Sequence, residues 1–182
     1  TYCTPGMYEN ALATAGIENA DIKVAGRFNI SRTAALVGAI KAYENMTGEK
    51  VSEESADTAT NELVVTGQVA ENVGDQEKAE ELIGAVKGEV VDGNATTSEE
   101  IGDVVDQAAQ EMKVSLSEED RQAIIDLMKK ISDLDLNIDS LRQQAKNLYD
   151  RIAGLNLNLN IDEEQVKGFF EKILDFIKGL FS

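Results

Sequence analysis

The stretch LMKKISDLDLNIDSLRQQAKNLYDRI, residues 127–152, carries the strongest structural pattern in the chain. Apolar residues step through it by four and three positions without interruption, as in the seam of a heptad repeat. The pattern predicts one long helix from about residue 118 to about residue 153, roughly 50 Å in length. The seam consists of Leu127, Ile131, Leu134, Ile138, Leu141, Ala145, Leu148 and Ile152.

One part of this stretch fits the helix poorly. Residues 133–139 alternate between polar and apolar with a period of two and contain few strong helix formers. We expect the helix to continue, because the seam runs through both flanks of this segment. A local break there is the alternative.

Helix-start signals recur upstream of the seam, each with a serine or threonine placed to accept a backbone hydrogen bond. Gly16, Gly48 and Gly74 follow three of the predicted helices as stop signals, and a further helix is expected from about Asp75. The starts are Thr4-Pro5, Ser31, Ser52 before Glu53-Glu54, Thr97 with Glu100, and Ser117 with Asp120.

The N-terminal third contains one strand-like segment. Ile22, Val24 and Phe28 lie at even spacing, which predicts a short strand between two helices. The expected fold class is therefore mainly α (α+β), with a small N-terminal α/β portion, a helical bundle with one long helix, and a C-terminal amphipathic helix. We expect an α/β portion over residues 1–50, a helical region over 51–154, and a linker with the last helix over 155–182. Because the chain opens at Thr1 without methionine, residues 1–50 are expected to belong to a domain with further sequence upstream.

The composition excludes several function classes. The 182 residues include no histidine and one cysteine, so histidine-dependent triads and histidine-ligated metal sites are excluded. With 34 acidic and 17 basic residues the net charge is −17, which argues against a nucleic-acid partner. No apolar run is long enough to predict a transmembrane helix.

No sequence motif indicates an enzyme, and we expect no catalytic residue, cofactor or metal. Asp133, Asp135, Asn137 and Asp139 resemble the opening of a calcium loop. Ile138 replaces the required glycine, however, and Gln144 stands where a bidentate glutamate should be, so calcium is not expected there.

A positive island lies between Asp21 and Glu44, where four basic residues occur without an acid. The helix start at Ser31 adds free N–H groups, so a phosphate, a carboxylate or an acidic glycan could bind there. The simpler interpretation is an internal patch facing the acidic helices. The candidate anion-binding residues are Lys23, Arg27, Ser31, Arg32 and Lys41.

The predicted last helix, about residues 163–181, has one broad hydrophobic face that must be covered. The face could pack on the long helix of the same chain, dock on a protein partner, or lie on a membrane surface. Its candidate interaction residues are Phe169, Phe170, Ile173, Phe176, Ile177, Leu180 and Phe181.

Several separated blocks resemble one family in order along the chain. They are Met7–Leu12 with Thr14–Ile17, Ala20–Ala25, Thr33–Gly38 with Lys41–Glu44 and Thr47–Lys50, Leu127–Ser132 with Leu134–Leu136, and Gln144–Asp150. Over about residues 4–153 the chain resembles the domain of unknown function 1002 family, the YpuA-like proteins of Gram-positive bacteria. The resemblance implies a secreted or envelope-associated protein and carries over no activity, cofactor or binding residue.

The expected function is that of an extracellular or cell-envelope protein acting as a non-enzymatic interaction or binding module. Its partner would be a protein or a membrane surface bound through the C-terminal helix. The alternative is an enzyme that acts on an anionic envelope or carbohydrate substrate near Arg27 and Arg32.

Overall fold

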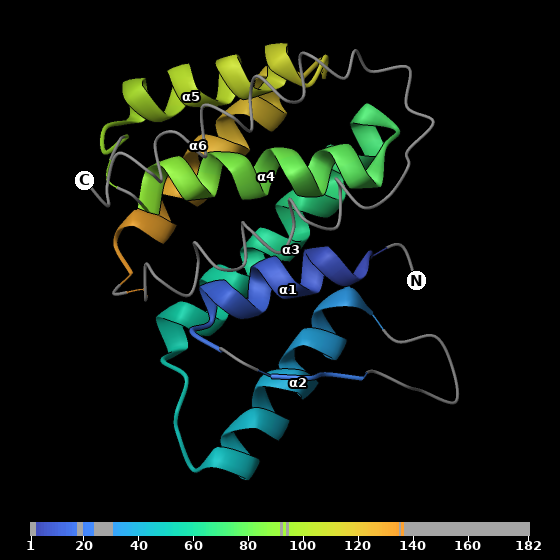
Figure 1. Ribbon diagram of the computed structural model, residues 1–182, viewed down its shortest axis with the longest axis vertical. Coiled ribbons are helices and arrows are strands. Elements are labelled where there is room, and N and C mark those ends of the chain that lie inside the picture. Colours follow the sequence, from blue (N-terminus) through green and yellow to red (C-terminus); the bar gives the residue numbers. More distant parts are fainter. Residues whose placement is uncertain are drawn as a thin grey trace, which may run out of the picture.

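The computed structural model describes residues 3–17, 20–23, 31–91, 93, 95–134 and 136. Over these residues the chain forms six helices and no strand (Figure 1). The helices are α1 (Pro5–Thr14), α2 (Arg32–Thr47), α3 (Glu53–Val73), α4 (Gln76–Val91), α5 (Ser98–Glu111) and α6 (Glu118–Ser132).

The predicted helix starts are confirmed. In α1, α2, α3, α5 and α6 a serine or threonine side chain accepts a hydrogen bond from a backbone N–H of the first turn. Thr97 and Glu100 form the full capping box expected at the start of α5. The stops at Gly48 and Gly74 are confirmed too, because both glycines adopt the left-handed conformation as C-caps.

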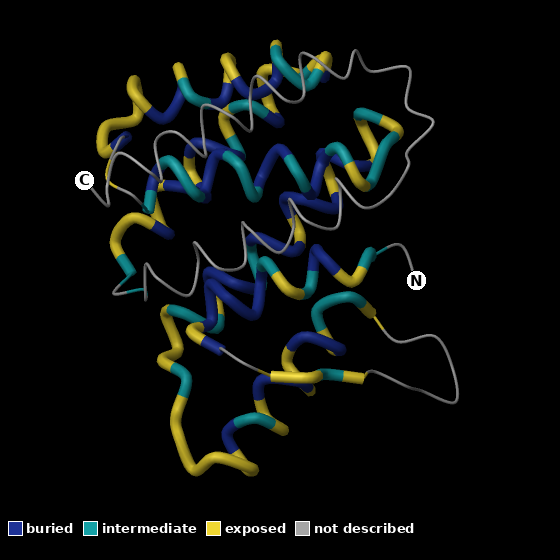
Figure 2. Tube along the Cα trace, viewed as in Figure 1, coloured by how far each residue is buried: buried dark blue, intermediate teal, exposed yellow. Residues whose placement is uncertain are grey.

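Helix α3 is the centre of the bundle. It packs against α1, α2, α4 and α6, while α5 lies on α4 and α6 (Figure 1). The buried sides of the helices face one another across a single hydrophobic core (Figure 2). The large side chains that are fully buried at its centre include Leu36, Leu63, Leu82, Ile83, Ile101, Ile124, Leu127 and Met128.

The predicted N-terminal α/β portion is wrong for the residues that the structure describes. Residues 20–23, which include Ile22, form no strand, and residues 24–30 lie outside the described part. Ile22 is half-buried and packs against the helical core. Its side chain therefore finds its hydrophobic partners without a neighbouring strand.

The prediction of one unbroken helix from about residue 118 to about residue 153 is also wrong, because α6 ends at Ser132. Lys129 and Lys130 occupy the last turn, where positive charge favours the helix end. Asp133 follows as the C-cap, and Leu134 N–H donates to the Ile131 carbonyl in a turn. Leu127 and Ile131 are buried as predicted, Leu134 is half-buried, and Ile138 and the rest of the seam lie outside the described residues.

A buried ion pair joins α1, α3 and α4. The Lys87 ammonium lies 2.7 Å from Glu62 Oε1, and the two residues are 4% and 0% exposed. Lys87 also donates to the Asn10 carbonyl at 2.8 Å and to Thr14 Oγ1 at 3.2 Å, and Thr14 donates to Glu62. All three ammonium protons thus have acceptors, which compensates the loss of hydration.

An acidic group at the start of α4 makes stability depend on pH. Burial, reinforced by Glu80, Glu77 and Asp75, raises the pKa of Glu81 from its usual value of 4.5 to about 7. Between these two pH values the folded state holds a proton that the unfolded state releases. Stability therefore falls as the pH rises from 4.5 to about 7, and the cost persists above that.

We expect Glu81→Gln to raise the melting temperature at pH 8, by about 2–4 °C, because the amide stays neutral. The gain should shrink as the pH approaches 4.5, where the wild-type carboxyl is itself protonated in the folded state. Thermal unfolding followed by circular dichroism at both pH values measures this. The control is Asp57→Asn, an exposed carboxyl on α3. An equal gain at pH 4.5 and pH 8 would contradict the assignment.

Candidate functional site

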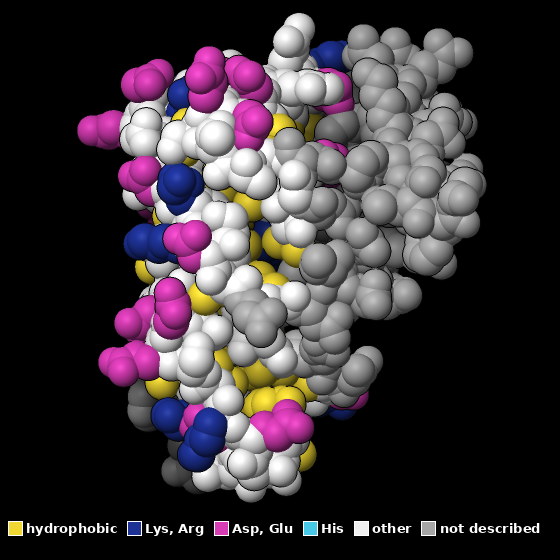
Figure 3. All heavy atoms as spheres, turned by 90° about the vertical axis from the view of Figure 1, so that its left-hand side faces the viewer, with side chains coloured by type: hydrophobic (Ala, Val, Ile, Leu, Met, Phe, Trp, Pro, Cys, Tyr) yellow, Lys and Arg dark blue, Asp and Glu magenta, His cyan; other side chains and the backbone are white. Residues whose placement is uncertain are grey.

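A surface pocket of about 450 Å³ opens where the end of α1, the α2–α3 connection and the end of α6 meet. Three segments that are far apart in sequence form its walls. They contribute Ala15 and Gly16; Tyr43, Glu49, Lys50, Val51, Ser52, Glu54 and Ser55; and Asp133 and Leu134. The pocket lies on the side of the molecule that faces the viewer in Figure 3, where acidic side chains are more widespread than basic ones.

The wall formed by residues 48–52 is held in place by Glu44, a buried carboxylate of α2. Its Oε1 accepts the Val51 N–H at 3.2 Å, and its Oε2 lies 2.7 Å from Lys41 Nζ and 3.8 Å from Lys50 Nζ. The hydrogen bond from Lys41, together with that from the Val51 N–H, lowers the pKa of Glu44. Glu44 therefore stays ionised near neutral pH and fixes the backbone that lines the pocket.

The lining combines carboxylates, hydroxyls and one aromatic ring. Glu49, Glu54 and Asp133 outnumber the single cation Lys50, so the pocket carries excess negative charge. The Tyr43 hydroxyl donates to Glu49, which orients the ring beside the opening. Ser52 caps α3, and its hydroxyl donates to the Ser55 hydroxyl at 2.8 Å. Such a lining suits a hydroxyl-rich ligand that carries a positive charge.

Three residues of the predicted positive island, Ser31, Arg32 and Lys41, belong to α2 or to its N-cap. Ser31 is the N-cap of α2, Lys23 is exposed, and Arg27 lies outside the described residues. Arg32 forms an ion pair with Glu71 of α3 at 2.6 Å, and Lys41 forms one with Glu44. Arg32 and Lys41 are about 13 Å apart along the axis of α2, so these two do not converge on one small anion. Anion binding at this island stays a prediction.

Gly67 explains how Arg32 reaches α3. A Cβ at Gly67 would collide with the Arg32 guanidinium, so the absence of a side chain there lets the arginine lie across the helix. Arg32 is in this way part of the α2–α3 contact.

The predicted interaction face of the last helix, Phe169 to Phe181, lies outside the described residues. So do Asp135, Asn137 and Asp139 of the calcium-like segment, where no calcium is expected. Among the described residues, no group of three or more cysteine and acidic side chains is placed to hold a metal ion. In the same part of the chain, no helix is long and apolar enough to cross a bilayer.

The pocket was not predicted from the sequence. Most of its residues are ordinary polar residues near helix ends, and nothing in their spacing shows that residues 15–16 and 133–134 meet residues 43–55. The two glycines at positions 16 and 48, both with positive φ, indicate the turns of the chain but not their meeting.

Comparison with known proteins places the chain among relatives without an assigned role. A family model described as "Protein of unknown function (DUF1002)" matches residues 1–148. The "Uncharacterized protein YpuA" of Bacillus subtilis (strain 168) is 36% identical over 135 residues, which cover 74% of this chain and 46% of that protein. The matched part thus spans less than half the length of this relative. No solved structure matches the chain.

Proposed function

Because this chain belongs to the DUF1002 family, which is described only as being of unknown function, we propose a role from its own geometry. We propose that it is a non-enzymatic binding module of an extracellular or cell-envelope protein, with the pocket between α1, α2, α3 and α6 as its recognition site. The observation that carries the proposal is the mixed lining of carboxylates, hydroxyls and a tyrosine in one pocket of about 450 Å³.

The lining favours one class of ligand. A positively charged amine would be attracted by the three carboxylates, and ligand hydroxyls would exchange hydrogen bonds with the serine and tyrosine hydroxyls. An aliphatic ring could lie against the Tyr43 side chain. An amino sugar combines these three features, and it is the simplest probe of the site.

The extracellular or envelope setting rests on the family resemblance alone, because neither the net charge of −17 nor the Bacillus subtilis relative distinguishes this setting from the cytoplasm. Fractionation of a producing Gram-positive cell, followed by immunoblotting with an antibody to this chain, tests the setting. Recovery of all the protein in the cytoplasmic fraction would contradict this part of the proposal.

We expect glucosamine to bind the pocket weakly and Glu54→Gln to lower its affinity several-fold, because the variant removes one attracting charge from the lining. The measurement is a titration followed by NMR chemical shifts, with N-acetylglucosamine as the uncharged analogue. N-acetylglucosamine should bind less tightly to the wild type and should be nearly insensitive to Glu54→Gln.

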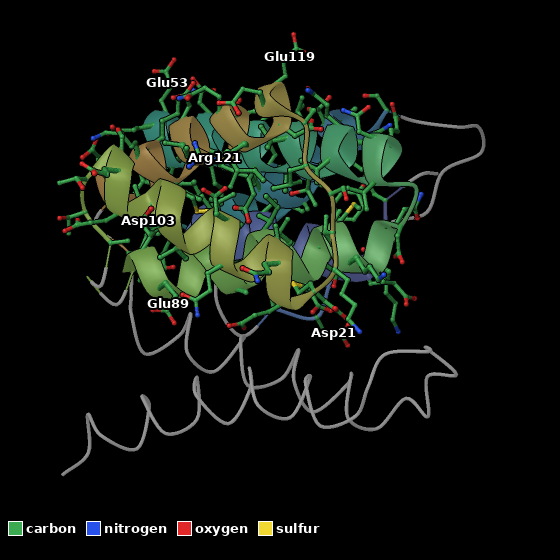
Figure 4. All side chains as sticks on the ribbon, turned by 90° about the horizontal axis from the view of Figure 1, so that it is seen from above. Asp21, Glu53, Glu89, Asp103, Glu119 and Arg121 are labelled. Carbon is green, nitrogen blue, oxygen red and sulfur yellow. The ribbon has the colours of Figure 1, made fainter. Side chains whose placement is uncertain are left out.

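The matched control for this prediction is Glu53→Gln. Glu53 and Glu54 both lie in the first turn of α3 and interact alike with the helix dipole, but Glu53 is not part of the pocket. Glu53 points outward from the body of the protein (Figure 4). Equal effects of the two substitutions, or no shift of any pocket resonance at millimolar glucosamine, would refute the proposed ligand class.

A further inference from the structure

Among the described residues that line the pocket, Lys50 is the one cation, and its ammonium group is not paired at hydrogen-bond distance. Lys50 Nζ lies 3.8 Å from Glu44 Oε2, which is too long for a hydrogen bond, whereas Lys41 Nζ lies 2.7 Å from the same oxygen. Lys41 thus neutralises the Glu44 carboxylate. The Lys50 side chain is 78% exposed, so its N–H donors are available to a ligand.

The backbone that carries Lys50 is fixed on both sides by side chains of α2. Before it, the Glu49 N–H donates to Thr47 Oγ1 at 3.1 Å. After it, the Val51 N–H donates to the buried Glu44 carboxylate at 3.2 Å. The ammonium group is therefore presented from a preorganised wall of the pocket, which lowers the conformational entropy lost when a ligand binds.

A second donor in the lining follows Lys50 in the first turn of α3. The Ser55 hydroxyl oxygen accepts a hydrogen bond from the Ser52 hydroxyl at 2.8 Å, and the Ser55 N–H donates to Ser52 Oγ at 3.0 Å. In the described part of the chain, the proton of the Ser55 hydroxyl has no acceptor, so it can be donated to a ligand oxygen. The pocket thus offers an anionic group one charged donor and one neutral donor.

The other charges of the lining limit which anionic ligand can bind. Glu49, Glu54 and Asp133 repel a ligand that carries negative charge alone. A phosphate ester carries more negative charge than one ammonium group can balance, whereas a carboxylate matches it one to one. A ligand that combines an amine with a single carboxylate therefore fits the charges of the whole lining.

We propose that the ligand of this pocket is an amino sugar that also carries a carboxylate, and that Lys50 is the residue that recognises the carboxylate. This inference rests on the proposed function, which supplies the amine and its attraction to the acidic residues. It narrows the ligand class from a cation to a zwitterion. Lys50 then determines specificity, because it attracts the carboxylate of such a ligand and repels the amine of a plain amino sugar.

The first test compares glucosamine with muramic acid, which is glucosamine with a lactic acid ether at O3. Muramic acid keeps the amine and adds a carboxylate. Each is titrated into the wild-type chain at about pH 6, where the amine is largely protonated and the carboxylate is ionised. NMR chemical shifts of the pocket residues should show about two- to fivefold tighter binding of muramic acid. Equal or weaker binding of muramic acid would overturn the proposal.

The second test removes the charge of Lys50. Lys50→Met should weaken muramic acid binding about two- to fivefold and leave glucosamine binding unchanged or slightly tighter, because it also removes a cation that repels the amine. Lys50→Arg keeps the charge and should keep the preference for muramic acid. Lys113→Met controls for net charge, since Lys113 is exposed and is not part of the pocket. Equal weakening of both ligands by Lys50→Met would refute the role of Lys50.

Glu54→Gln separates failure of this inference from failure of the proposed function. It should weaken both ligands, because both carry the amine. If Glu54→Gln has this effect while Lys50→Met leaves muramic acid binding unchanged, the amino-sugar pocket stands and the carboxylate site is refuted. If neither ligand shifts a pocket resonance at millimolar concentration, both proposals are refuted.

Discussion

Replacement of Lys87 by methionine is expected to destabilise the fold by about 3–5 kcal/mol, because it leaves the Glu62 carboxylate buried without its cation. The loss also removes the hydrogen bonds from Lys87 to the Asn10 carbonyl and to Thr14. Urea unfolding at pH 7 measures the change in the free energy of unfolding. Methionine is chosen because it keeps most of the length of the side chain, so loss of packing contributes little.

Two further variants separate the buried charge from other effects. Lys87→Met/Glu62→Leu should recover part of the loss, since neither charge then remains buried alone. Lys130→Met, at an exposed lysine of α6, should change stability by about 0.5 kcal/mol or less. If the double variant is no more stable than Lys87→Met, the unpaired carboxylate is not the source of the loss.

Leu127→Ala is expected to cost about 2–5 kcal/mol, because Leu127 is 0% exposed and its removal opens a cavity in the centre of the core. The same urea titration gives the value, and its slope should stay that of the wild type. Asp126→Ala is the control, because it changes the exposed neighbouring position of α6 without opening a cavity in the core. A loss below about 0.5 kcal/mol for Leu127→Ala would mean that the seam is not packed at this position.

The helix starts could be predicted from the sequence because capping is local chemistry. Thr97 Oγ1 accepts the Glu100 N–H and the Glu100 carboxylate accepts the Thr97 N–H, so both hydrogen bonds form within one turn, whatever the rest of the chain does. The same holds for Ser117, whose hydroxyl accepts the Asp120 N–H at 3.1 Å. Helix starts of this kind can therefore be predicted without knowledge of the tertiary fold.

Two predictions about the fold were wrong: the strand that includes Ile22 and the continuous helix beyond Ile131. In both cases a regular sequence pattern was outweighed by other interactions. Ile22 has the alternation of a strand, yet in the described residues it packs on helices without a paired strand. The seam beyond Ile131 has heptad spacing, but Ser132 and Asp133 favour a helix end over continuation once Lys129 and Lys130 stabilise the last turn. Heptad spacing alone does not predict where these residues end the helix.

The buried pair and the pocket could not be predicted, because each depends on contacts between residues far apart in the chain. Glu62 and Lys87 are charged residues on helices, and such residues normally lie in solvent. Only the packing of α1 on α3 and α4 shows that both are enclosed. Likewise, Tyr43 and Asp133 line one pocket because α6 ends beside the α2–α3 connection.

The ion pair of Lys87 has a consequence for the order in which the chain folds. Its acceptors in α1 lie 77 and 73 residues before it, whereas Glu62 lies 25 residues before it. During synthesis α1 leaves the ribosome before α3 and α4, so the groups that hold it in place emerge only later. Pairing of α3 with α4 closes a short loop and can occur early, while docking of α1 closes a long one. Helix α1 therefore docks later than α3 and α4 pair with each other, and until then its apolar face is exposed to other newly made chains.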